Sequence, residues 1–453
     1  MKKAKLFTIL LLLALLASCG RTVYEPVEQV EARETEINLG YIETPIMPEP
    51  SPEPEPEPEI PAEIPSYDIF TSGRPRSEYL YDLDFLYATL LENFPFFGVI
   101  YRSLGVDMHE RFAEMRRYVE TVDDFRTDTV FSNALNRHFI RPARYYGHLS
   151  ILHRDSVRGH AQSFSSSTQF APFLDELNNP STRALHRLTD ADFTPPREGA
   201  DSFVFATTSD NIQTEIIEEG RIAYVNILSM MGATMELDRV TLINFFNQVA
   251  DYDHLIIDIR QNSGGHSEFF PNLVMAPNIS QTLHVYNYFF IMDGAHNRQM
   301  LMNWFGPLED SEFNPADDTL LARMPYLSED DLKMLDFYRA TTRVIEPSHG
   351  DGIFGGKIWL LVSQMNFSAS ELAAAAVKQT GFATLVGRTT GGDGIGIQPI
   401  VLALPNTGIV VRYSSIYGTC PLGRSNQEFG TTPHIFNRPG LDALQTVLEI
   451  IEE

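Results

Sequence analysis

A serine between a predicted strand and a predicted helix is the residue of this sequence best placed for nucleophilic chemistry. Ile358–Val362 is a short apolar run typical of a buried strand, and Leu372–Val377 is an alanine-rich run with high helix propensity. Ser368 lies between them, at the expected helix N-terminus, where free backbone N–H groups and the helix dipole favour developing negative charge. Ser368 and Glu371 also fit a plain helix-capping box, and this alternative stays open at this point.

A glycine pair offers groups that would stabilise such a charge. Gly264 and Gly265 follow the apolar run Leu255–Ile259, which predicts another buried strand. Glycines at the carboxyl end of a strand allow a turn with exposed backbone N–H groups, at the sheet edge where α/β folds bind ligands. The N–H of Gly264 or Gly265, together with that of Ala369, would form an oxyanion hole. A simple tight turn is the competing interpretation.

A third stretch, 387–396, is also rich in glycine. It lacks the Gly-Lys-Ser/Thr ending and the following helix of a phosphate-binding loop. The flexible wall of a peptide-binding groove fits this stretch better.

The motifs, in their order along residues 215–437, resemble those of the C-terminal processing (tail-specific) serine peptidases. They are Asp-x-Arg-x-Asn-x-Gly-Gly from Asp258, Ser-Ala-Ser-Glu from Ser368, Val-Gly-x-Thr-x-Gly-Gly from Val386 and Glu-x-Gly-x-x-Pro from Glu428. The resemblance implies a ClpP/crotonase-like α/β core with a mainly parallel sheet. It also implies that Ser368 is the nucleophile.

The sequence differs from one branch of this family in the residue that would serve as general base. That branch uses a lysine in a Gly-Lys-Gly segment, and here Asp393 holds the place, 25 residues after Ser368. The carboxylate of an aspartate cannot replace a lysine amine of lowered pKa as the general base. Lys378, ten residues along the same predicted helix, would lie about 15 Å away. We therefore expect no Ser–Lys dyad, and we expect Asp393 to be a loop residue.

The other branch, which has a tricorn-like core, takes a histidine base from the N-terminal part and a glutamate from near the C-terminus. Resemblance implies that His148, in Tyr-Gly-His-Leu, is the general base, and that Glu428 orients its imidazole directly or through an intermediary. His266, directly after the glycine pair, is a rival base. Ordinary structural roles for His148 and Glu428 remain alternatives. We expect no metal and no cofactor, because nothing places His138, His148 and His153 on one face.

The net charge of the chain limits the kinds of partner that it can bind. The chain has 453 residues, is 43% hydrophobic and carries a formal net charge of -26, which argues against nucleic acid. Residues 20–66 hold 12 glutamates and two arginines, so part of this charge belongs to a tail. The family resemblance implies a peptide or an unfolded protein as the partner. Substrate preference and oligomeric state do not follow from the sequence.

The N-terminus predicts export and a membrane anchor. Basic residues precede the apolar run Leu6–Leu16, and Leu-Ala-Ser-Cys ending at Cys19 resembles a bacterial lipoprotein box. This implies lipidation of Cys19 and an extracytoplasmic protein. The Pro/Glu repeat within residues 20–66 predicts a semi-rigid spacer. The only other cysteine is Cys420, so a disulfide framework is excluded.

The predicted organisation alternates strands and helices after a helical start. Its segments are a signal peptide (1–19), a disordered tether (20–66), a small helical N-terminal domain (67–154), a connecting loop region (155–200), a peptidase core (201–437) with an insertion (294–350), and a C-terminal helix (438–453). Helices are expected at 82–94, 112–119, 124–139, 237–250, 268–275 and 329–338, and strands at 203–206, 221–228, 283–291, 383–386, 400–404 and 408–413. Few strand signals between His153 and Phe203 indicate that no peptide-binding PDZ domain is present.

The sequence therefore predicts a membrane-tethered serine peptidase that acts through an acyl-enzyme on Ser368. The alternative is a catalytically inactive relative that binds peptides or proteins in the same groove, because the lysine is missing and the His148 and Glu428 segments match imperfectly.

Overall fold

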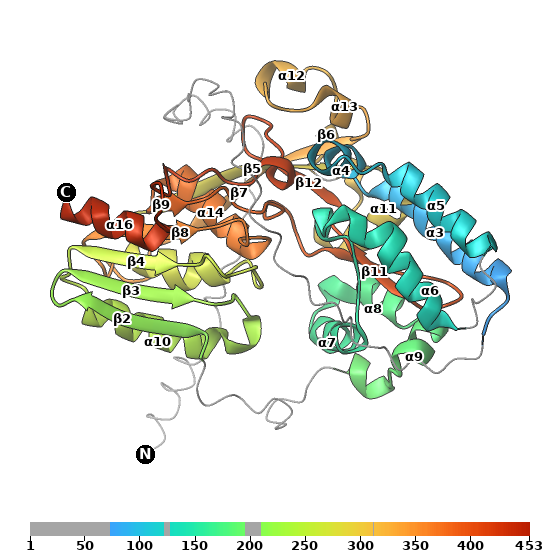
Figure 1. Ribbon diagram of the computed structural model, residues 1–453, viewed down its shortest axis with the longest axis horizontal. Helices are drawn as coiled ribbons and strands as arrows, with labels where there is room; N and C mark the ends of the chain where they lie inside the picture. Colours follow the sequence, from blue (N-terminus) through green and yellow to red (C-terminus); the bar gives the residue numbers. More distant parts are fainter. Residues whose placement is uncertain (1–72, 122–126, 195–209, 311) are drawn as a thin grey trace.

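The computed structural model describes residues 73–121, 127–194, 210–310 and 312–453 (Figure 1). The predicted signal peptide, the tether with Cys19 and the predicted strand at 203–206 lie outside these residues.

The central element is a six-stranded sheet with the strand order β13-β9-β8-β4-β3-β2. Its strands are β2 (Ile212–Glu218), β3 (Ile222–Ile227), β4 (His254–Asp258), β8 (Lys357–Val362), β9 (Thr384–Gly387) and β13 (Ile435–Phe436). All neighbours pair in parallel except β2, which is antiparallel to β3. This confirms the predicted α/β fold with a mainly parallel sheet.

Both faces of this sheet are covered, as the continuous apolar character of its strands requires. On β4, Leu255 and Ile257 join the core on one face and Ile256 joins the core on the other. Helices α10 (Met235–Gln248) and α14 (Ala369–Thr380) pack on the first face, and α16 (Ala443–Glu452) packs on the second (Figure 1). The predicted C-terminal helix is therefore present.

The N-terminal part is helical, as predicted, with α3 (Arg76–Asn93), α4 (Phe97–Leu104), α5 (Met108–Thr121) and α6 (Asp128–Leu135). Among the described residues, no single helix is long and apolar enough to cross a membrane, although the bent pair α3 and α4 meets the length and composition criteria jointly.

The prediction of a connecting loop at 155–200 is wrong for its described part, up to 194. This segment forms α7 (Arg154–Phe164), α8 (Ala171–Leu177) and α9 (Pro180–His186). Val157, Ala161 and Phe164 form a buried stripe at helical spacing on α7. The surrounding serines and charged residues mask this stripe in the sequence.

A small sheet joins this helical part to the C-terminal part of the chain. Strand β11 (Val410–Tyr413) pairs antiparallel with both β1 (Ser150–Ile151) and β10 (Ile400–Ala403). Its apolar residues belong to the same core cluster as helices α3 to α8. The predicted boundary between a helical domain (67–154) and a core (201–437) is therefore not observed, because the β10–β11 pair packs against the helices.

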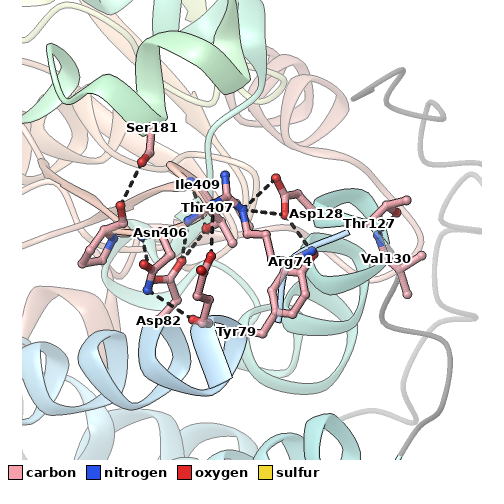
Figure 2. A network of polar contacts seen from close by, with 12 residues as sticks. Arg74, Tyr79, Asp82, Thr127, Asp128, Val130, Ser181, Asn406, Thr407 and Ile409 are labelled. Atoms are coloured by element: carbon pink, nitrogen blue, oxygen red, sulfur yellow. Dashed lines mark hydrogen bonds and ion pairs between the residues drawn. The ribbon is translucent and has the colours of Figure 1, made fainter. Parts of the chain in front are cut away.

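A polar network fixes the β10–β11 turn to α3 (Figure 2). The fully buried carboxylate of Asp82 accepts hydrogen bonds from the backbone N–H groups of Asn406 (2.9 Å) and Thr407 (2.8 Å) and from the Thr407 hydroxyl (2.7 Å). Beside it, Asp128 accepts hydrogen bonds from Arg74 and Tyr79.

The predicted insertion (294–350) contributes to a second, antiparallel sheet of order β12-β5-β7-β6. The strands are β5 (Leu283–Ile291), β6 (Asn314–Pro315), β7 (Phe337–Ile345) and β12 (Ile416–Thr419), with α11 (Ala295–Phe305), α12 (Leu320–Arg323) and α13 (Glu329–Leu332) between β5 and β7. The helix predicted at 329–338 is thus one turn only, because the chain continues into β7, which pairs with β5 along its length.

Candidate active site

Ser368 lies at the corner between β8 and α14, with its backbone N–H donated to the carbonyl of Gly392 (3.2 Å). Its φ of 57° is a conformation that non-glycine residues rarely adopt. The Ser368 side chain makes no capping hydrogen bond to α14. Instead, Ser370 accepts from a backbone N–H at the corner and donates to the carbonyl of Asn262 (2.6 Å). The capping-box interpretation of Ser368 is therefore wrong.

The glycine pair packs directly against this corner. A Cβ added to Gly264, whose φ is 105°, would lie 2.6 Å from the carbonyl oxygen of Phe367 and 2.8 Å from the amide nitrogen of Ala369. The Gly264 N–H is already donated to the side chain of Asn262 (2.8 Å). In the described part of the chain, the N–H groups of Gly265 and Ala369 have no acceptor. Gly264 thus allows close approach, and Gly265 and Ala369 keep donors free for an oxyanion.

His148 is a buried residue that precedes β1. Its Nδ1 contacts the carboxylate of Asp393 and lies 3.1 Å from the hydroxyl of Ser414. Its ring packs on that of Phe367, with 4.5 Å between centroids, next to Ser368. Within the described residues, no hydrogen bond joins His148 to the Ser368 hydroxyl. The imidazole therefore lies beside the Ser368 corner, with Nδ1 in contact with a carboxylate.

Asp393 is a loop residue in its backbone, as expected, but its side chain holds His148. The loop is fixed by Asn426, the first residue of α15 (Asn426–Phe429). The side-chain oxygen Oδ1 of Asn426 accepts from the backbone N–H groups of Gly394 (2.7 Å) and of the next residue (3.2 Å), and its side-chain Nδ2 donates to Glu371 (2.7 Å). This contact of Asp393 was not predicted from the sequence, although the place of Asp393 in the lysine motif was a signal.

Glu371 lies fully buried at the first turn of α14. One of its carboxylate oxygens accepts from Asn426 and from the hydroxyl of Thr431 (2.6 Å). Burial, only partly offset by these hydrogen bonds, raises the pKa of the Glu371 carboxyl to about 7.

The structure does not place Glu428 against His148. Its carboxylate accepts from Arg102 Nε (2.9 Å) and Nη2 (2.7 Å), and the same guanidinium also binds the buried carboxylate of Asp331. The expected orienting role of Glu428 is therefore not observed, because Arg102 occupies this carboxylate. The preceding residue, Gln427, accepts from the backbone N–H of Gly147 (2.7 Å) and so positions the turn that carries His148.

The rival base His266 is exposed. Its backbone N–H is donated to the carbonyl of Met230 (2.6 Å), and its Nδ1 accepts from the N–H of Glu268 (3.3 Å). Among the described residues, it has no hydrogen bond with Ser368.

Comparison with known proteins identifies the class of this domain. Residues 221–436 match the sequence model of peptidase family S41. No curated protein sequence matches the chain.

Three solved structures show weak overall likeness. A candidate peptidase from Parabacteroides merdae is 17% identical, with 84% of this chain and 96% of that chain covered and a TM-score of 0.47. The mature form of CPAF is 14% identical (80% and 92% covered, TM-score 0.48). The photosystem II D1 C-terminal processing protease is 13% identical (83% and 98% covered, TM-score 0.38). All three scores lie below 0.5, so the assignment depends on the sequence match.

The β-sheet domain that carries Ser368 is therefore a peptidase-type domain. The chain carries a domain of peptidase family S41.

Proposed function

We propose that this protein hydrolyses peptide bonds in peptides or unfolded proteins through an acyl-enzyme on Ser368, with His148 as general base. The observation that carries the proposal is the position of His148, which packs on the residue next to Ser368 while a carboxylate holds its Nδ1. A carboxylate only accepts hydrogen bonds, so the proton is expected on Nδ1, which leaves the Nε2 lone pair as the base.

The chemistry then follows in two halves. His148 Nε2 takes the proton of the Ser368 hydroxyl as Oγ attacks the scissile carbonyl, and the backbone N–H groups of Gly265 and Ala369 stabilise the oxyanion. The imidazolium returns the proton to the leaving amine as the C–N bond breaks. Water, deprotonated by the same imidazole, hydrolyses the ester and restores Ser368. Catalytic hydrogen bonds often form or tighten only when substrate binds, so a His148 ring that packs on Phe367 without a hydrogen bond to Ser368 is compatible with this role.

The test is hydrolysis of an unfolded protein and labelling by a fluorophosphonate, which reacts with activated serines. We expect Ser368→Ala and His148→Ala to abolish turnover with unchanged circular dichroism, and His266→Ala to retain it. A fully active His148→Ala variant would remove His148 as the base. A folded wild-type protein that shows neither hydrolysis nor labelling would favour the inactive, peptide-binding alternative.

We further propose that lipidated Cys19 anchors the protein outside the cytoplasm, with residues 20–66 as a spacer. The lipoprotein-like sequence around Cys19 supports this. Cys19→Ser is expected to move the protein from the membrane fraction to the soluble fraction, whereas membrane retention of this variant would contradict the anchor.

A further inference from the structure

Asp393 stands where lysine-dependent relatives carry their base, yet its contacts are those of a carboxylate partner for an imidazole. Its Oδ2 contacts His148 Nδ1 and accepts a hydrogen bond from the Ser414 hydroxyl (3.0 Å). The side chains of His148 and Asp393 are only 7% and 6% exposed. In such a site, little solvent competes for the carboxylate, so its charge acts mainly on the imidazole.

The loop around Asp393 is built to hold this side chain in place. Asp393 has a φ of 53°, a conformation that a non-glycine residue rarely adopts and that persists only where the surroundings enforce it. A Cβ on Gly392 would lie 2.6 Å from the carbonyl of Asn426, and one on Gly394 would lie 2.3 Å from the amide nitrogen of Leu372. Both flanking glycines thus pack against backbone, and Asn426 binds the N–H of Gly394.

The other carboxylate that could serve His148 is committed elsewhere. Glu428 binds Arg102 through two hydrogen bonds, and this guanidinium bridges it to Asp331. In the described chain, Asp393 is the acidic residue in contact with the His148 imidazole.

We infer that Asp393 is the positioning residue of a Ser368–His148–Asp393 triad and takes the role that resemblance assigns to Glu428. This inference depends on the proposed peptidase function. Asp393 fixes Nδ1–H, so that Nε2 faces the reaction as a base, and it stabilises the imidazolium formed when Ser368 loses its proton. The proton stays on the imidazole until it passes to the leaving amine, and Asp393 does not take it up.

The experiment compares Asp393→Asn with Glu428→Gln in the full chain, since both replace a carboxylate by its amide. An asparagine amide donates to Nδ1, which moves the imidazole proton to Nε2 and leaves no base. For Asp393→Asn we expect kcat to fall about 10²- to 10⁴-fold with little change in KM, as in other triads. Glu428→Gln is expected to keep most of kcat.

A second readout does not need turnover. Nitrogen-15 NMR of the histidine rings, with His148 assigned by its loss in His148→Gln, reports which nitrogen carries the proton. We expect Nδ1–H in the wild type and in Glu428→Gln, and Nε2–H in Asp393→Asn. An Asp393→Asn variant that keeps both kcat and the Nδ1–H form overturns the inference, as does a larger kcat loss in Glu428→Gln. If the wild type is inactive and resists the fluorophosphonate, the peptidase proposal fails, while the NMR pattern still decides which carboxylate sets the imidazole.

Discussion

At the scale of single residues, backbone strain gathers at the candidate triad. Among the described residues, six that are not glycine have a positive φ, and they include Ser368 (57°), His148 (53°) and Asp393 (53°). Each such residue costs about 1–3 kcal/mol, and such residues are concentrated at functional sites. The three side chains of the candidate triad therefore depend on neighbours that enforce their backbone conformation.

Gly264 is such a neighbour, and Gly264→Ala is expected to reduce kcat by about 10²-fold, because misplacing a reacting group by about 1 Å has an effect of this size. The new Cβ would displace Phe367 or Ala369 and with them the Ser368 corner. Gly396→Ala is the control, since a Cβ there would meet only Ile416, at 3.7 Å. Steady-state kinetics and circular dichroism check the prediction, and equal kcat values for the two variants would contradict it.

The sequence predicted the place of Ser368 between a strand and a helix, because an apolar strand and an alanine-rich helix are local patterns. It did not predict the partner of His148, because that choice depends on contacts between distant segments. Asp393 lies 245 residues from His148 in the sequence. Arg102, which binds the Glu428 carboxylate, lies 326 residues from Glu428. The order of the motifs alone could not show whether Asp393 or Glu428 contacts the His148 imidazole.

At the scale of elements, hydrogen bonds from the single turn α15 connect the Asp393 loop and the His148 turn to α14. Asn426 holds the Asp393 loop and Gln427 holds the His148 turn, while the buried Glu371 holds Asn426. The sequence placed α14 correctly but did not predict α15, because a single helical turn carries no periodicity. Its positioning role follows only from its side-chain contacts.

The buried Glu371 carboxyl predicts a pH-dependent stability. Its pKa is raised from an ordinary 4.5 to about 7, so between these values the folded state binds a proton that the unfolded state has lost. The free energy of unfolding therefore falls as pH rises from about 4.5 through 7, by about 3 kcal/mol for this group.

Urea unfolding at pH 5 and pH 8 tests this against Glu371→Gln, whose amide oxygen still accepts from Asn426 and Thr431. The variant is expected to lose less stability than the wild type between the two pH values, by about 3 kcal/mol. Equal losses would show that Glu371 is ionised in the folded protein at both pH values.

At the scale of the whole molecule, the chain crosses between its two main parts several times. The mainly parallel sheet was predictable from alternating apolar strands and amphipathic helices. The contact between the helical part and the C-terminal strands was not predictable. It pairs Asp82 with Asn406 and β1 with β11, and such contacts between distant segments leave no local sequence pattern. The predicted boundary near 200 therefore divides a single apolar core cluster, which runs from Tyr79 to Tyr417.

This shared core predicts that residues 210–453 do not fold alone, although they contain the complete family match. Without the N-terminal helices, the buried residues of β10 and β11 would lie open to water, among them Leu402, Val411 and Tyr413. Each large apolar side chain contributes about 1.5–3 kcal/mol on burial, so exposing several costs an amount comparable to the typical stability of a domain, about 5–15 kcal/mol. We expect the 210–453 fragment to aggregate or to lack near-ultraviolet circular dichroism, and 73–453 to show a cooperative thermal transition. A soluble 210–453 fragment with cooperative unfolding would restore the predicted boundary and make the helical part an accessory domain.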